Sequence, residues 1–191
     1  MQRSTLDKLI SSLGLVLAIV LVIASGLMFY SSNFIHTQVK TQLNDQRITF
    51  PEINSDQVTS LPAEDQKLVA QYAGQQLLTG KQAKIFADNY IAVHIDKIGG
   101  GKTYSELSSA SMADPADTKL AAQVQTVFRG ETLRGLLLNA YAFDTVATIA
   151  KIGALVALGA AAVLLVLVAA GFGHAQKVSK PKKLAVTKKR R

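Results

Sequence analysis

The stretch Ile152–Phe172, IGALVALGAAAVLLVLVAAGF, contains 21 residues and no charged side chain. As an α-helix that rises about 1.5 Å per residue it would be roughly 31 Å long, which matches the hydrocarbon thickness of a bilayer. Eleven of its residues are Leu, Ile, Val or Phe, and each favours insertion by about 0.3 to 0.6 kcal/mol. Because the core helix of a soluble protein rarely stays apolar on every face, this stretch is predicted to cross a membrane.

A second apolar run, Leu9–Tyr30, extends for 22 residues without a charge. It is predicted to be another transmembrane helix that also serves as an uncleaved signal anchor. The alternative is a cleavable signal peptide, for which Ala24-Ser25-Gly26 is the candidate cleavage site. The apolar part of a signal peptide is usually about 7–15 residues long. Because this run is longer, we expect it to be retained as a span.

The basic residues around the two spans predict their orientation. Arg3 and Lys8 precede the first span, and eight basic residues without an acid lie in the segment 177–191. Since Lys and Arg near a span favour the cytoplasmic side, both termini are expected in the cytoplasm and residues 31–144 outside it. Aromatic side chains favour the membrane interface, and four would lie at the outer one: Phe29, Tyr30, Tyr141 and Phe143.

These features predict an all-α membrane protein in which two transmembrane helices flank a helical extracytoplasmic domain. The expected segments are a cytoplasmic N-terminus (1–8), a first transmembrane helix (9–30), the extracytoplasmic domain (31–144), a second transmembrane helix (145–172) and a basic, disordered cytoplasmic tail (173–191). The extracytoplasmic segment has ten basic and twelve acidic residues. It is therefore near neutral, although the whole chain carries a net charge of +8.

Apolar spacing and capping residues predict the helices of the segment 31–144. The first span is expected to continue outward, because Ile35, Val39 and Leu43 recur at helical spacing. Ile48–Phe50 fits a short extended piece, and Ile91–Ile95 alternatively fits a strand. Four further helices are expected: one from about Pro62 to Gly80, one over Lys81–Ile98, one opened by Thr103–Glu106, and one opened by Asp114-Pro115 that continues into the membrane.

The tail has too few aliphatic residues to bury a core. Its cations are expected to contact anionic lipid headgroups, each contributing about 1 kcal/mol near the surface. The alternative is that they only fix the topology. The basic end also matches a dilysine retrieval signal, a pattern that a basic terminus produces by chance. The candidate lipid-contact residues are Lys182, Lys183, Lys188, Lys189, Arg190 and Arg191.

The residues that carry chemistry do not form a convincing site. The chain has no cysteine, which excludes a disulfide, a thiolate metal site and a cysteine nucleophile. Gly99–Thr103 imitates the end of a phosphate-binding loop, but Asp96 replaces the glycine that such a loop requires. His36 and His94 could join a carboxylate as an iron site, although their spacing does not indicate one. We therefore predict that the protein is not an enzyme and has no cofactor, metal or nucleic-acid partner.

Small residues recur along both spans at about one-turn spacing, which lets helix backbones approach closely. The two spans either pack on each other within one chain or pair with another membrane protein or a second copy. The candidate helix-packing residues are Gly14, Ala18, Gly26, Gly153, Ala157 and Ala161.

Asp144 and Lys151 are ionisable residues at the edge of the second span, seven residues apart and thus on nearly the same helix face. They either lie at the outer interface, where Lys151 reaches toward headgroups, or dock a partner. Arg129 and Arg134, in the helix that precedes this span, are further candidates for a partner contact.

Three stretches carry a resemblance to a known family: Tyr72–Gln76, Gly101–Glu106 and Gln123–Phe143, the last containing the run RGETLRG at 129–135. Over roughly residues 50–172 the chain resembles uncharacterised two-span integral membrane proteins of high-GC Gram-positive bacteria. Some members carry the name of an aromatic-ring-opening dioxygenase subunit, which would imply an iron site for which this sequence offers no ligand set. The resemblance implies a bacterial plasma membrane.

These observations favour an accessory or scaffold protein that presents its extracytoplasmic domain for protein contacts. A ligand-sensing module with the same layout is the alternative. The predicted cytoplasmic segments, 1–8 and 173–191, leave no room for an output domain, so a sensor would have to signal through a separate partner.

Overall fold

The computed structural model describes residues 3–179, and all the regular structure within that range is helical. The only β-type pairing among these residues is an isolated bridge between Thr49 and Gln76. The all-α prediction is therefore confirmed at this level. The alternative of a strand over Ile91–Ile95 is wrong, because these residues are helical.

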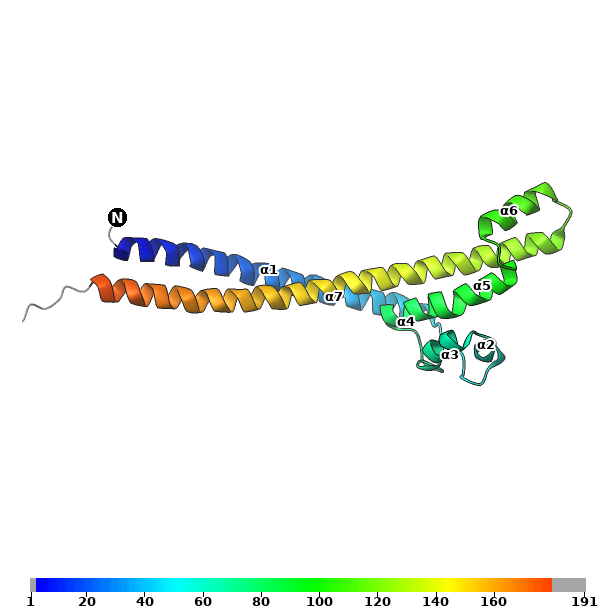
Figure 1. Cartoon of the computed structure of the whole chain (residues 1–191), viewed down its shortest axis with the longest axis horizontal. Coiled ribbons are helices and arrows are strands. Elements are labelled where there is room, and N and C mark those ends of the chain that lie inside the picture. Colours follow the sequence, from blue (N-terminus) through cyan, green and yellow to red (C-terminus); the bar gives the residue numbers. More distant parts are fainter. Residues whose placement is uncertain (1–2, 180–191) are drawn as a thin grey trace, which may run out of the picture. The chain divides into compact units, whose positions relative to one another are not determined.

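Two long helices, α1 and α7, contain the apolar runs and are uninterrupted from end to end (Figure 1). The shorter helices lie between them in the chain. The elements are α1 (Arg3–Gln46), α2 (Asp56–Thr59), α3 (Ala63–Ala70), α4 (Gly80–Ile85), the π-helical turn η1 (Phe86–Ile91), α5 (Ala92–Gly99), α6 (Tyr104–Ala113) and α7 (Thr118–Ser179). Both α1 and α7 include a stretch that is long and apolar enough to cross a membrane, which confirms the prediction at the level of length and composition.

The chain divides into two compact units. The first unit, called the apolar pair below, comprises Met1–Tyr30 and Ala150–Arg191. The second, called the helical unit, comprises Ser31–Ile149. Each unit therefore contains part of α1 and part of α7.

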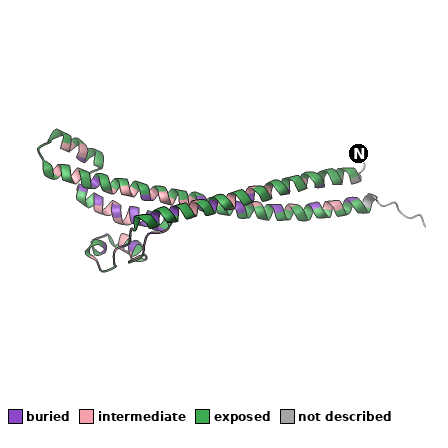
Figure 2. Cartoon of the chain, turned by 180° about the vertical axis from the view of Figure 1, so that it is seen from behind, coloured by how far each residue is buried: buried purple, intermediate pink, exposed green. Residues whose placement is uncertain are grey.

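The buried residues of the apolar pair recur every seven positions along the sequence. In Figure 2 buried residues appear as isolated purple patches along the largely green long helices. A seven-residue repeat keeps one seam of each helix facing its partner in a left-handed supercoil. Most of the seam residues are small, so the two backbones approach closely. They are Ser11, Ala18 and Ser25 on α1, and Ala154, Ala161, Val168 and Ala175 on α7.

The helical unit has its own apolar core, drawn from α1, α7 and the segments between them. Five rings pack in series within or beside this core, with centroid separations from 4.5 to 5.3 Å: Tyr72, Phe50, Phe86, Tyr90 and His94. The largest fully buried side chains of the unit are Phe50, Leu43, Leu77, Leu137, Val58 and Val69.

Two expected helix boundaries are wrong. Helix α3 ends at Ala70 instead of near Gly80, because the chain turns through a left-handed conformation at Gly74 (φ 68°). The backbone N–H of Leu77 then donates to Ile48 O at 2.9 Å. Helix α7 begins at Thr118, where the Asp117 carboxylate accepts from the N–H of Leu120. Asp117 therefore caps the helix in place of the expected Asp114.

The predicted helix Lys81–Ile98 is present as the continuous series α4, η1 and α5. The helix begins at Gly80, one residue before the expected Lys81, and a capping box between Thr79 and Gln82 precedes it. It ends where Gly100 adopts a left-handed conformation (φ 63°), as glycines at helix ends commonly do. The expected capping box at Thr103 and Glu106 opens α6. The π-helical turn was not predicted.

Candidate functional site around Asp144

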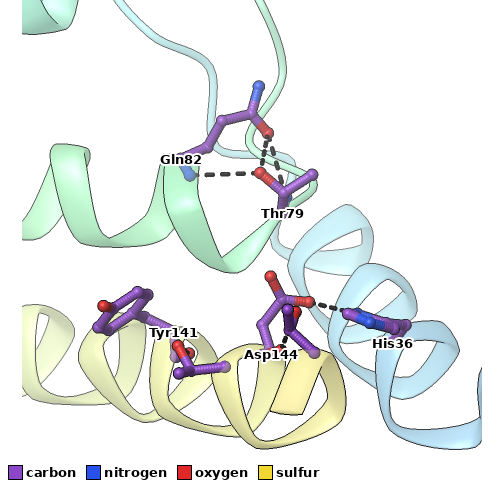
Figure 3. A network of polar contacts seen from close by, with 7 residues as sticks. His36, Thr79, Gln82, Tyr141 and Asp144 are labelled. Carbon is purple, nitrogen blue, oxygen red and sulfur yellow. Dashed lines mark hydrogen bonds and ion pairs between the residues drawn. The ribbon is translucent and has the colours of Figure 1, made fainter. Parts of the chain in front are cut away.

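Asp144 joins three helices of the helical unit. It projects from α7, and its Oδ1 lies 2.7 Å from Nδ1 of His36 on α1 (Figure 3). Because an ionised carboxylate only accepts hydrogen bonds, the proton of this bond belongs to the imidazole. Both side chains are partly accessible. The pair links residues 108 positions apart in sequence.

The third helix, α4, begins against the same carboxylate. A Cβ placed at Gly80 would collide with the side chain of Asp144, so only glycine permits this approach. The Thr79 side chain accepts from Gln82 N, and the Gln82 side chain accepts in return from the N–H of Thr79 at 3.1 Å. This capping box fixes the start of α4 beside Asp144 (Figure 3).

A groove of about 520 Å³ opens beside this cluster. Two lysines of α4, Lys81 and Lys84, lie on one side of it, and α7 supplies the other side. Its cations, hydroxyls and apolar walls suit a small ligand that carries an anionic group. The lining residues are Leu68, Lys81, Lys84, Ile85, Asn89, Tyr141, Asp144, Thr145 and Thr148.

A network of ion pairs continues from the groove. Asp88 of the π-helical turn receives Lys84 Nζ at 2.6 Å and Arg134 Nη2 at 3.3 Å, and Arg134 also pairs with Glu131 at 3.4 Å. Burial raises the pKa of Asp88, but the bonds and charges of Lys84 and Arg134 lower it more, so the net pKa lies below its usual value. The hydrogen bond to Asp88 raises the pKa of Lys84. Asp88 and Lys84 are therefore both charged at neutral pH.

The four candidate partner-contact residues differ in their surroundings. Asp144 shares a hydrogen bond with His36 and Arg134 forms an ion pair with Asp88, whereas Arg129 and Lys151 are exposed. The Nε atom of Arg134 is buried without a hydrogen-bond partner in the described structure. Asp144 and Arg134 thus hold helices together, and the exposed pair remains available for outside contacts.

The six candidate helix-packing residues also differ. Ala18 and Ala161 are buried, and Ala157 is half-buried. A Cβ at Gly14 would press on Val168, and one at Gly153 would collide with Met28. Gly26 faces open space instead. The seam uses a seven-residue repeat, so a glycine one position beyond Ser25 points away from it.

Two seam residues were missed by the sequence reasoning. Ser25 Oγ donates to Ala154 O across the pair at 2.8 Å, and Ser11 lies against Gly171. The spacing of Ser11, Ala18 and Ser25 is itself a heptad signal. A four-residue spacing of small residues, which the sequence also offers, does not indicate Ser11 or Ser25.

A second groove, of about 340 Å³, runs between the parts of α1 and α7 that belong to the helical unit. Its lining differs from that of the first groove, because the residues that form it are apolar or carry amides. They are Phe34, Ile35, Gln38, Val39, Gln42, Leu43, Gln46, Leu136, Asn139, Ala140 and Phe143.

The histidines do not converge. His94 Nδ1 bonds to the carbonyl of Tyr90, and His174 pairs with Asp7 in the apolar pair. Over residues 3–179, no group of three or more His, Cys, Asp or Glu side chains is placed to hold a metal ion. The six candidate lipid-contact residues, Lys182, Lys183, Lys188, Lys189, Arg190 and Arg191, lie outside the described residues.

Comparison of the chain with models of protein families, with curated proteins and with solved structures found no match. The class that the structure defines is thus an all-helical chain with two helices able to span a membrane.

Proposed function

We propose that the protein is a non-enzymatic, two-span protein of a bacterial plasma membrane that presents residues 31–144 outside the cytoplasm as a helical platform for protein contacts. In this role it is an accessory or scaffold component of a membrane complex. The observation that carries the proposal is the register of the apolar pair. Its two apolar runs, which come from opposite parts of the sequence, lie side by side, and the ends of one run match the ends of the other.

Four contacts give this register: Ser11 with Gly171, Gly14 with Val168, Ser25 with Ala154, and Met28 with Gly153. They place Leu9–Tyr30 beside Ile152–Phe172 in antiparallel order. Neither sequence run by itself requires its ends to match those of the other. Matched ends are what a bilayer of fixed thickness demands of two spans.

The outward faces of the pair support a lipid environment. Leu13, Val156 and Val166 are each more than 65% exposed, at 68%, 67% and 69%. A soluble monomer rarely exposes a continuous apolar surface of this kind. Ionisable side chains occur only at the two ends of the aligned runs, with Asp7 and His174 at one end and Lys151 at the other.

The structure of the helical unit supports the role of a platform for protein contacts. It has its own core, and two grooves open on its surface. A folded exported unit on a two-helix anchor suits a protein whose work is to contact other proteins.

Cysteine labelling tests the topology, and the chain supplies a background without thiols. A Ser109→Cys variant should react with a membrane-impermeant maleimide in intact cells, since Ser109 is exposed on α6. A Lys177→Cys variant, at the other end of the chain, should react only after the cells are made permeable. The reverse pattern, or recovery of the protein in the soluble fraction, would contradict the proposal.

A ligand-sensing module that signals through a separate partner is the second candidate, and the groove beside Asp144 favours it. Lys81 makes no ion pair in the described structure, so its ammonium is available to an anionic ligand. A screen of small anionic compounds by thermal shift on the purified protein tests this candidate. A hit should lose at least tenfold in affinity in Lys81→Ala, and should keep its affinity in Lys119→Ala, a lysine distant in sequence from the groove.

A further inference from the structure

We propose that the uncharged groove between α1 and α7, lined by the eleven residues named above, is the surface on which a second copy of this chain docks. The inference rests on the proposed function, since it names one partner for the platform. It is carried by the charge of the groove, by its amides and by the exposure of its apolar side chains.

The first argument is charge. The described residues that line the groove include no acid and no base, although the segment 31–144 has ten basic and twelve acidic residues. In a two-fold contact the same patch lies on both copies, so residues near the axis meet their own counterparts. A charge there would face a like charge and repel it. A groove without charged residues avoids this repulsion when two copies meet.

The second argument is the set of amides. Gln38, Gln42 and Gln46 recur every four residues on one face of α1, and Asn139 lies opposite on α7. None of these side chains has a hydrogen-bond partner within residues 3–179. An amide both donates and accepts. It can therefore pair with an identical amide of a second copy, which neither a lysine nor a carboxylate can do.

The third argument is the exposed apolar surface at the edges of the groove. Phe34, Leu136 and Phe143 are 54%, 55% and 60% exposed. Removing large apolar side chains such as these from water is favourable, so an interface that buries them gains stability.

Other occupants fit the groove less well. A lipid acyl chain would leave four amides without partners in an apolar medium, which is unfavourable. A strongly charged peptide would find no opposite charge in the lining. A second copy satisfies both the amides and the apolar side chains.

Crosslinking tests the proposal on the full chain. Variants Gln38→Cys and Gln42→Cys, reconstituted in lipid nanodiscs or mild detergent, should form a covalent dimer with a short bis-maleimide. Lys40→Cys is the matched control, because Lys40 is exposed on the opposite side of α1. Crosslinking that is equal at Lys40, or absent at both glutamines, would overturn the proposal.

A charge-swap experiment gives a second readout at an exposed position that the fold does not need. Gln42→Lys and Gln42→Glu should each weaken the dimer at least tenfold in native mass spectrometry, since like charges would then meet across the two-fold axis. Mixing the two variants should restore a mixed dimer. Lys40→Glu should leave the dimer unchanged. Failure of the mixture to recover, with both variants folded, would contradict a contact at Gln42.

The outcome separates this proposal from the one on which it rests. A monomer whose Ser109→Cys variant is still labelled from outside would overturn the dimer and leave the membrane platform intact. A covalent dimer whose Ser109→Cys variant is labelled only after permeabilisation would keep the contact and overturn the orientation. A heterologous protein captured on the groove in place of a second copy would also overturn the dimer.

Discussion

At the scale of single residues, Asp144 and Gly80 decide how the middle of the chain packs on the long helices. Asp144 could be singled out in the sequence because it is an ionisable residue at the edge of an apolar run. Its partners could not, since His36 is 108 positions away and Gly80 resembles an ordinary helix-breaking glycine. The missing side chain of Gly80 is what allows α4 to rest on α7.

Replacing Gly80 with Ala should destabilise the helical unit, because the new Cβ would collide with Asp144. We expect a loss of about 1–3 kcal/mol, the usual cost of overpacking. The measurement is the thermal midpoint followed by circular dichroism in detergent. Gly135→Ala is the control: Gly135 is helical with open space around it, so alanine should be neutral or stabilising there.

Asp88→Asn should lower stability at neutral pH and have little effect in acid. The pKa of Asp88 is depressed in the folded protein, so its contribution is present above the unfolded pKa and is lost as pH falls through the folded pKa. Asparagine has no negative charge to balance the positive charge of the half-buried Arg134. The check is the thermal midpoint of both proteins at pH 7 and near pH 3. An equal difference at both pH values would contradict this account.

At the scale of elements, the helices follow from spacing and caps, whereas their seams do not. The capping box at Thr103 and the glycine stop at Gly100 were readable because each acts within a few residues. The heptad seam of the apolar pair required knowledge of which face meets the partner. Gly26 shows the limit, since it is small and correctly placed within a span but faces open space.

A designed disulfide should form across this seam. The Cβ atom of Ser11 lies 3.5 Å from the position that a Cβ would take at Gly171, which is within the usual range for a disulfide. The double variant Ser11→Cys/Gly171→Cys should therefore oxidise within one chain, detected as faster migration in a non-reducing gel. Ser12→Cys/Gly171→Cys should not, because Ser12 is exposed on another face.

At the scale of the whole molecule, the question is whether lipid or water surrounds the apolar pair. Apart from Ser12 and Tyr30 near the ends of the first run, the exposed side chains of Leu9–Tyr30 and Ile152–Phe172 are apolar. In water these apolar surfaces would cause aggregation, whereas in a bilayer they would contact the hydrocarbon chains of the lipid.

A lysine at the centre of the second apolar run separates these cases. Val163→Lys should reduce the membrane-inserted fraction, because a lysine near the bilayer centre costs about 2.5–3.5 kcal/mol on insertion scales. Val163 is exposed in the structure, so a water-soluble protein would tolerate the change. Val146→Lys, also exposed but at the outer edge of the expected span 145–172, should insert normally, because a lysine there can reach the headgroups. Cell fractionation with alkaline carbonate extraction measures both.

By itself the sequence determined that the described chain is all-helical, that two runs are long and apolar enough to span a membrane, that glycines end α5 and that a capping box opens α6. These properties depend on composition and on neighbours within one or two helical turns. The tertiary structure alone decided that Asp144 pairs with His36, that α4 begins against it at Gly80, and that Ser11, Ala18 and Ser25 form the seam. Such contacts join residues that are far apart in the sequence, and their geometry depends on which helix faces meet when the chain folds.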